Sequence, residues 1–162
     1  MAGGRNVGMS EGEFKTWVRD AFKRAGIWFE AYEPRRGGGV GSPDTQILIE
    51  GVLYPLELKV CELGRSKFGK VDDEIIWSKD VRPDQIGWHE RFKSAGGWSA
   101  FIIGFGVTHL RPDRIFLAEL QDILEWKKGI PVYKTYEVPV WQMTHKEKAA
   151  RHIVSICENL RG

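Results

Sequence analysis

The chain has 162 residues, 42% hydrophobic and 28% charged, which excludes wholesale disorder and fits one domain with an ordinary core. Its 24 basic and 22 acidic residues leave a formal net charge of +2, which neither indicates nor excludes a nucleic-acid partner. Two cysteines cannot build a disulfide framework, and no apolar run approaches the ~20 residues of a membrane span. We therefore expect a soluble protein of a reducing compartment, with no membrane partner.

A helix and a strand are expected first. Residues 1–9 are Gly-rich and are expected to be flexible, so that a single domain spans 10–162. Ser10 and Glu13 fit a capping box at the start of the helix, and Gly26 fits its end. Between them the apolar residues follow a helical period: Phe14, Trp17, Val18, Ala21, Phe22 and Ala25. A strand is expected at 27–32, and a loop rich in Gly and Arg at 34–41.

The rest of the chain alternates between strands and helices. Strands at 45–49 and 52–60 are joined by a turn at Glu50-Gly51, and the polar segment 61–81 is expected to be a mobile loop. A helix at 83–95, a buried strand at 99–105 and its hairpin partner at 115–117 follow. A short helix at 120–128, a strand at 133–138 and a helix opened by Thr144 and Glu147 complete the chain. This order predicts a mixed α/β domain, a central sheet flanked by helices.

The turn at Glu50-Gly51 fixes which residues of the two strands face each other. A two-residue turn places Ile49 opposite Val52, and counting outward places Gln46 opposite Pro55 in a non-hydrogen-bonded pair. Proline has no amide hydrogen to donate, so it fits that position without losing a bond to this partner. The same register places Asp44 opposite Glu57.

The hairpin thus predicts a charged cluster on one face. Lys59 joins Asp44 and Glu57, whereas the other face is apolar: Ile47, Ile49, Val52, Tyr54, Leu56, Leu58 and Val60. Two opposed carboxylates repel each other, and a divalent cation, Mg²⁺ first, would remove the repulsion. Lys59 could then position or activate a water for attack on a phosphodiester. The plainer alternative, a surface acid pair bridged by Lys59, would be favoured for an isolated pair without the preceding Pro-Asp.

These residues resemble a known signature. Ser42-Pro43-Asp44 followed by Glu57-Leu58-Lys59 resembles the motif of the PD-(D/E)XK nuclease superfamily, and Gly41-Ser42-Pro43-Asp44 is similar to the form in Holliday junction resolvases of the RecU and archaeal Hjc kind. The likeness covers roughly residues 10–140. It includes Arg82-Pro83-Asp84-Gln85 at a helix start, Gly96-Gly97 before the strand at 101–105, and a RecU-like segment at 115–136. The loop before Gly41 is too short for the protruding stalk of RecU.

The resemblance implies a restriction-endonuclease-like core and a Mg²⁺-dependent nuclease in which Mn²⁺ substitutes. It implies Asp44, Glu57 and Leu58 as the metal-site residues. Lys59 is implied as the base that orients water or stabilises the transition state. Glu13 matches the acid of the first helix, which reaches the metal directly or through water. Glu11 is a rival for that role, and the alternative for Glu13 is the capping box alone.

Further residues are candidates for contact with DNA. Arg35 and Arg36 could bring guanidinium groups to phosphates from the Gly-rich loop, with Ser42 just after it. The other candidates are Arg65 and Lys67 in the loop after Lys59, and Gln85, which matches the polar residue of the family's second helix. The alternative for the basic residues is a solvated loop. Trp77, Trp88 and Trp98 could stack on unpaired bases, although packing is favoured.

The leading hypothesis is a Holliday junction resolvase, a structure-specific endonuclease of DNA recombination and repair. It would make paired symmetric nicks in branched DNA by hydrolysis with a metal-activated water. The two-fold symmetry of a four-way junction favours a homodimer. The alternatives are another PD-(D/E)XK endonuclease, of restriction or repair type, and a non-catalytic DNA-binding module. The expected location is the cytoplasm of a bacterial, archaeal or phage-infected cell.

Overall fold

The computed structural model describes residues 9–31, 41–65, 71–77, 81–105, 112, 114–128, 136–139 and 145–162. Within these residues the elements follow in the order α1 (Glu11–Arg24), β1 (Trp28–Ala31), β2 (Thr45–Ile49), β3 (Val52–Arg65), β4 (Val71–Trp77), α2 (Pro83–Ser94), β5 (Ala100–Phe105), β6 (Arg114–Ala118), α3 (Leu120–Lys127), β7 (Tyr136–Val138) and α4 (Lys146–Arg161). This is the mixed α/β architecture that the sequence predicts. No helix in the described ranges is long and apolar enough to cross a membrane.

β3 is the central strand of the sheet. The strand order is β1-β2-β3-β5-β6-β7, and β4 pairs with the second half of β3. β2 and β4 run antiparallel to β3, whereas β5 runs parallel to it, a pairing that requires the crossover through α2. β3 therefore bonds to β2 at its start, to β5 along residues 56–61 and to β4 at its end. Its middle residues lie inside the sheet.

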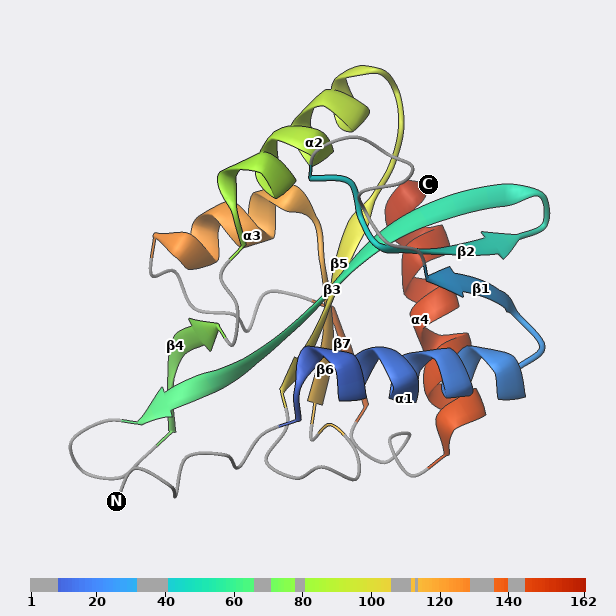
Figure 1. Ribbon diagram of the computed structural model, residues 1–162, viewed down its shortest axis with the longest axis horizontal. Coiled ribbons are helices and arrows are strands. Elements are labelled where there is room, and N and C mark those ends of the chain that lie inside the picture. The colour runs from blue at the N-terminus through green and yellow to red at the C-terminus, as the bar shows by residue number, and fades with distance from the viewer. Residues whose placement is uncertain are drawn as a thin grey trace.

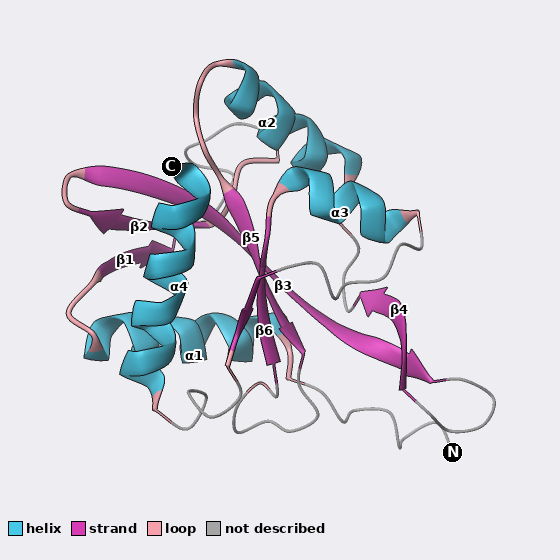
Figure 2. Cartoon of the chain, turned by 180° about the vertical axis from the view of Figure 1, so that it is seen from behind, coloured by secondary structure: helices cyan, strands magenta, loops and turns pink. Residues whose placement is uncertain are grey.

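Helices cover both faces of the sheet (Figures 1 and 2). α1 and α4 pack on one face, and their apolar residues share a core with alternate residues of β3, such as Leu56, Leu58 and Val60. α3 packs on the other face, where Ile123 and Trp126 share a second core with Phe101 and other residues of the sheet; Ile86 of α2 also contacts this core. The apolar face predicted for the hairpin is thus the face toward α1 and α4.

The register between β2 and β3 is confirmed. Ile49 pairs with Val52, and Gln46 pairs with Pro55. Glu50 and Gly51 both have positive φ, 50° and 80°, as a two-residue hairpin turn of type I′ requires. The last backbone pair is Thr45 with Leu56, so Asp44 and Glu57 follow at the end of the ladder.

The segment after the hairpin is not wholly a loop, and that prediction is wrong. β3 continues to Arg65, and β4 returns antiparallel beside it, with Cys61 opposite Trp77 and a register shift between Leu63 and Arg65. The polar composition of 61–81 was taken to indicate a loop. Strand formation depends on backbone pairing with a neighbour more than on intrinsic preference, and here β4 supplies the neighbour.

Three smaller points of the sequence interpretation change. Glu57 and Lys59 are both buried, so the face of β3 that carries them is covered. α2 and α3 pack over that side of the sheet. α4 begins after His145, whose carbonyl accepts from the amide of Ala149, while Thr144 lies outside the described residues. Met9 packs in the core next to α1, although residues 1–9 were expected to be flexible.

Candidate active site

The candidate site forms where the β2–β3 pair meets the first turns of α1 and α2. Asp44 directly precedes β2, and Glu57 lies on the neighbouring strand just beyond the last backbone pair. The hydroxyl of Thr45 donates to the carbonyl oxygen of Leu56 and fixes the chain at this point. The two carboxylates consequently come together as the register predicts, and each lies in the electric field of the other.

Glu57 is a buried carboxylate with an incompletely compensated charge. Glu57 is 4% exposed, and its Oε1 atom is buried without a hydrogen-bond partner among the described residues. Burial, followed by the negative charge of Asp44, raises the pKa of Glu57 to about 8, while the nearby charge of Lys59 acts in the opposite direction. A cation bound here would offset both causes of the shift, because it would stabilise the ionised carboxylate.

Two lysines approach the carboxylate pair from different elements. Lys15 of α1 donates a hydrogen bond from Nζ to Oδ2 of Asp44. Lys59 is 2% exposed, and its charge lowers the pKa of Glu57, which places it close to that carboxyl group. The hairpin pattern predicted the position of Lys59. It could not predict Lys15, which reaches Asp44 through the packing of α1 on the sheet.

The first helix offers two acids, and they lie in different surroundings. Glu13 closes the predicted capping box: its Oε1 accepts from the amide of Ser10 at 3.0 Å, and its own amide donates to Oγ of Ser10 at 3.1 Å. Glu11 lies four residues before Lys15 on the same side of α1, and its negative charge raises the pKa of Glu57. Glu11 therefore contributes to the field at the carboxylate pair, whereas Glu13 caps the helix.

The start of α2 forms another wall of the site. Gly41 has φ of +84°, and a Cβ atom there would lie 2.0 Å from the carbonyl oxygen of Asp84, so the Gly-Ser-Pro-Asp segment packs tightly on this helix end. Gln85 is buried, and its Oε1 accepts from the amide of Arg82 at 3.0 Å. The guanidinium of Arg82 is held by Asp84 at 3.0 Å. Its pKa is raised by Asp84 and, more weakly, by Glu57 and Glu11, which shows that it borders the site.

The donor set of the site fits a hard divalent cation held by few protein ligands. Oδ1 of Asp44 and Oε1 of Glu57 are both buried and accept no hydrogen bond from the described residues. The side chain of Leu58 lies in the core, which leaves its carbonyl oxygen as the one atom suited to a metal. In the described part of the chain, no three His, Cys, Asp or Glu side chains gather as a metal-binding group. Mg²⁺ suits such a site, because it retains several waters and uses one or two carboxylates.

The residues expected to contact DNA lie in different places: two are buried, one ends β3 and three are outside the described residues. Ser42 and Gln85 are buried beside the carboxylate pair, at 3% and 5% exposure, and Oγ of Ser42 has no hydrogen-bond partner among the described residues. Arg65 is the last residue of β3. Arg35, Arg36 and Lys67 lie outside the described residues.

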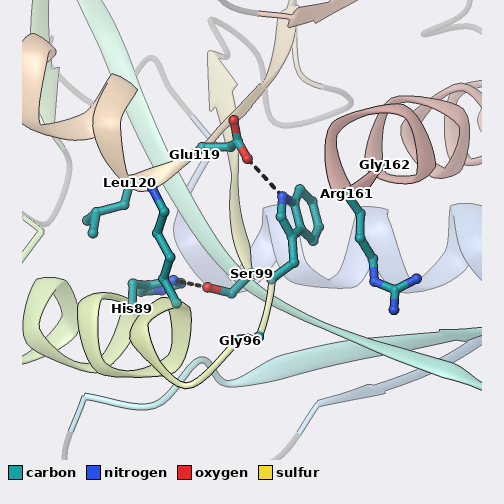
Figure 3. A pocket seen from close by; sticks show the side chains of 10 residues that line it. His89, Gly96, Ser99, Glu119, Leu120, Arg161 and Gly162 are labelled. Atoms are coloured by element: carbon teal, nitrogen blue, oxygen red, sulfur yellow. Dashed lines mark hydrogen bonds between the residues drawn. The ribbon is translucent and has the colours of Figure 1, made fainter.

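A separate pocket of about 380 Å³ lies at the far end of α2 (Figure 3). In it, Trp98 donates from its indole nitrogen to Glu119 at 2.8 Å, and Nδ1 of His89 lies 2.6 Å from Oγ of Ser99. Trp98 also packs edge-on against Tyr54, so its surroundings match the packing role that the sequence favoured. None of the predicted site residues lines this pocket.

The chain has no match by sequence and is similar to solved structures of other proteins. No protein-family model and no curated protein matches the sequence. Among solved structures, the chain is similar to a protein described as a "VRR_NUC domain", with 18% identity over 74% of this chain and 96% of that one, at a TM-score of 0.39. It is also similar to Hjc of Archaeoglobus fulgidus, described as a Holliday junction resolvase, with 11% identity over 68% of this chain and 78% of that one, at a TM-score of 0.44.

Proposed function

We propose that this chain is a Mg²⁺-dependent endodeoxyribonuclease that cuts four-way DNA junctions. The observation that supports it most strongly is the pair Asp44–Glu57, in which each carboxylate has a buried oxygen without a hydrogen-bond partner among the described residues. A buried carboxylate beside a half-buried one costs stability unless the charge is compensated, so the presence of this pair favours a function. The resemblance of Gly41–Asp44 and Glu57–Lys59 to junction resolvases is the second support.

In the proposed reaction, a water oxygen bonds to the phosphorus of a phosphodiester while the bond to one ester oxygen breaks, and the proton that the water loses passes through solvent to the leaving oxygen. Asp44, Glu57 and the carbonyl oxygen of Leu58 would hold the metal. When bound, the metal lowers the pKa of the attacking water and stabilises charge on the phosphate. Lys59 donates hydrogen bonds to the water or to the phosphate, and Lys15 holds Asp44 in position.

We further propose that the enzyme acts as a homodimer. Trp28, Leu48 and Leu53 form a row across β1, β2 and β3, because Trp28 pairs with Leu48 and Leu48 pairs with Leu53. These side chains are 43%, 38% and 51% exposed, although they are large and apolar. They stand on the face of the hairpin that carries Glu57. A second copy that covers this row would place two sites on one side of the dimer, as two symmetric cuts in a two-fold junction require.

The proposal is tested with a labelled four-way junction and a linear duplex that has the sequence of two of its arms. Each is incubated with the protein in Mg²⁺ and in EDTA, alongside Glu57→Gln and the matched variant Glu30→Gln on the exposed side of β1. We expect paired nicks in the junction alone, absent in EDTA, reduced more than a hundredfold in Glu57→Gln and retained in Glu30→Gln.

Other outcomes of the cleavage assay would contradict parts of the proposal. Equal cutting of both DNAs would keep the nuclease and refute junction specificity. Cleavage that persists in EDTA or in Glu57→Gln would refute the proposed site. A wild-type protein that binds the junction but cuts nothing in Mg²⁺ or Mn²⁺ would indicate a non-catalytic binding module instead.

A further inference from the structure

α1 carries a row of four charged residues, each four positions after the last: Glu11, Lys15, Arg19 and Lys23. Residues at this spacing are neighbours on the surface of a helix. Glu11 and Lys15 belong to the candidate active site, through the field at Glu57 and the contact with Asp44. The other two extend the row away from the site toward β1, about 12 Å along the helix axis from Lys15 to Lys23 (Figure 1). The row therefore leads from the site to the edge of the sheet.

The two outer residues of the row differ from the other bases of this region. Arg24, on the same helix, is paired with Asp20 at 3.1 Å, and Lys146 of α4 reaches the same carboxylate at 2.7 Å. Arg19 and Lys23 are exposed, and neither makes an ion pair with any residue that the structure describes. Asp20 thus pairs directly with Arg24 and Lys146, and its field reaches Lys23 more weakly.

A hollow lies beside Arg19 and Lys23. It has a volume of about 490 Å³ and is lined by Arg19, Lys23, Gly26, Ile27, Trp28 and Phe29. Two bases on one wall and the edge strand β1 on the other give a positively charged recess at the end of the row. Such a recess suits an anionic chain better than a neutral or cationic partner.

We propose that Arg19 and Lys23 bind the phosphate backbone of the DNA strand that runs from the active site along α1. This inference rests on the proposed function and adds a contact surface to it. The two bases lie beyond Lys15 on the row and supply affinity and orientation. At 3.4 Å of duplex axis per nucleotide, the 12 Å between Lys15 and Lys23 corresponds to about three to four nucleotides. Arg19 lies only four residues from Lys15, about 6 Å along the axis or about two nucleotides, so the bound phosphates should lie about two to four nucleotides from the cut.

The first test measures junction binding in EDTA, where no cleavage is expected, over a range of salt concentrations. The variants are Arg19→Gln/Lys23→Gln, the charge reversal Arg19→Glu/Lys23→Glu, and the control Arg24→Gln. Arg24→Gln removes one positive charge from the same helix, at a base that is already paired with Asp20, and measures the effect of charge loss outside the proposed contact. We expect the neutral double variant to lose roughly tenfold in affinity at low salt. The slope of log binding constant against log salt concentration should become shallower by about 2 in this variant. The charge reversal should lose more affinity, and the control should match the wild type.

A second test locates the contact on the DNA. Single uncharged methylphosphonates are placed at successive positions on both sides of the cleaved phosphate. We expect substitutions about two to four nucleotides away to weaken binding by the wild type but not by Arg19→Gln/Lys23→Gln.

The possible failures are distinguishable. Wild-type protein that binds no DNA would overturn the proposed function and this inference with it. Wild-type protein that binds DNA with a salt slope equal to that of both double variants would overturn the inference alone. Thermal unfolding of each variant checks that the fold is retained, as expected for exposed positions.

Discussion

Glu57 shows how burial and charge conflict at the scale of one residue. A carboxylate removed from water beside a second carboxylate is unfavourable in its ionised form, and its pKa rises to about 8 for that reason. Lys59 offsets part of this cost from the same strand, and Lys15 binds the partner carboxylate. Such an arrangement is useful when a cation takes the place of the missing compensation.

The acids of α1 give the first prediction, because the structure assigns them different surroundings. Glu11→Gln should lower the cleavage rate by about tenfold to a hundredfold, since Glu11 contributes to the field around the carboxylate pair. Glu13→Gln should leave cleavage near the wild-type rate, because glutamine can still accept from the amide of Ser10. Single-turnover cleavage assays measure both.

A measurement of stability tests whether Glu13 acts as a helix cap. Glu13→Ala should cost about 1 kcal/mol in the free energy of unfolding through the lost cap. The reverse outcome, a slow Glu13→Gln and an active Glu11→Gln, would restore Glu13 to the metal site that the sequence resemblance assigned to it.

The residues of the site were predictable to the extent that they depend on local pattern. Asp44, Glu57 and Lys59 follow from a hairpin register that a turn and one proline fix. Lys15, Glu11 and Arg82 come from helices whose place against the sheet depends on packing between distant segments. No sequence pattern predicts the contact between Lys15 and Asp44, which are 29 residues apart. The sequence shows only that Lys15 lies four residues after Glu11, on the same side of a helix.

At the scale of elements, the tight contact between the segment before β2 and α2 gives the second prediction. Gly41→Ala should destabilise the protein by the left-handed backbone cost of about 1–2 kcal/mol and by overpacking of a further 1–3 kcal/mol against Asp84. Gly51 has a similar φ of +80° but open space around it, so Gly51→Ala should show the backbone cost alone. Denaturant unfolding compares the two variants.

The difference between these variants is the informative quantity. Equal losses in Gly41→Ala and Gly51→Ala would show that the Gly-Ser-Pro-Asp segment does not pack on α2 as described. A larger loss in Gly41→Ala should be accompanied by slower cleavage, because the same segment carries Asp44.

His89 on α2 gives the third prediction, on pH. Its side chain is buried and stacks on Phe101, with ring centroids 4.3 Å apart, and burial lowers its pKa from 6.5 to about 4. Below pH 6.5 the unfolded chain takes up a proton at His89 that the folded chain does not, so stability should fall as pH falls to about 4 and then level off. The total contribution is up to about 3 kcal/mol.

The variant His89→Gln separates this contribution from the other titrating groups. The difference in unfolding free energy between wild type and His89→Gln should shrink between pH 7 and pH 4. A difference that stays constant over this range would contradict the burial of a neutral imidazole at this position.

Most elements follow from local sequence signals, and the exceptions have a common cause. The capping box at Ser10, the glycine at position 26 and the proline at position 83 mark helix ends that the structure confirms. β4 was missed because its polar residues give no alternating pattern, and it is a strand by virtue of pairing with β3. Pairing between segments is a property of the folded molecule that single-segment patterns do not contain.

At the scale of the whole molecule, the exposed apolar row on β1–β3 gives the fourth prediction. If a second copy covers it, Leu53→Arg should convert the protein to a monomer, because the arginine would be buried without a partner charge. The control Thr16→Arg adds the same charge on the exposed surface of α1 and should leave the dimer intact. Sedimentation equilibrium measures the mass. A wild-type monomer, or a Leu53→Arg dimer, would contradict the proposed interface.

The most direct measurement is a calorimetric titration of the DNA-free protein with Mn²⁺, because the account depends on a cation at the carboxylate pair. We expect the wild type and Glu30→Gln to bind Mn²⁺, and Asp44→Asn and Glu57→Gln to lose that binding while they remain folded by circular dichroism. If the wild type binds no Mn²⁺ or Mg²⁺, or if the two site variants bind Mn²⁺ as the wild type does, Asp44 and Glu57 are not a metal site and the proposed mechanism is wrong.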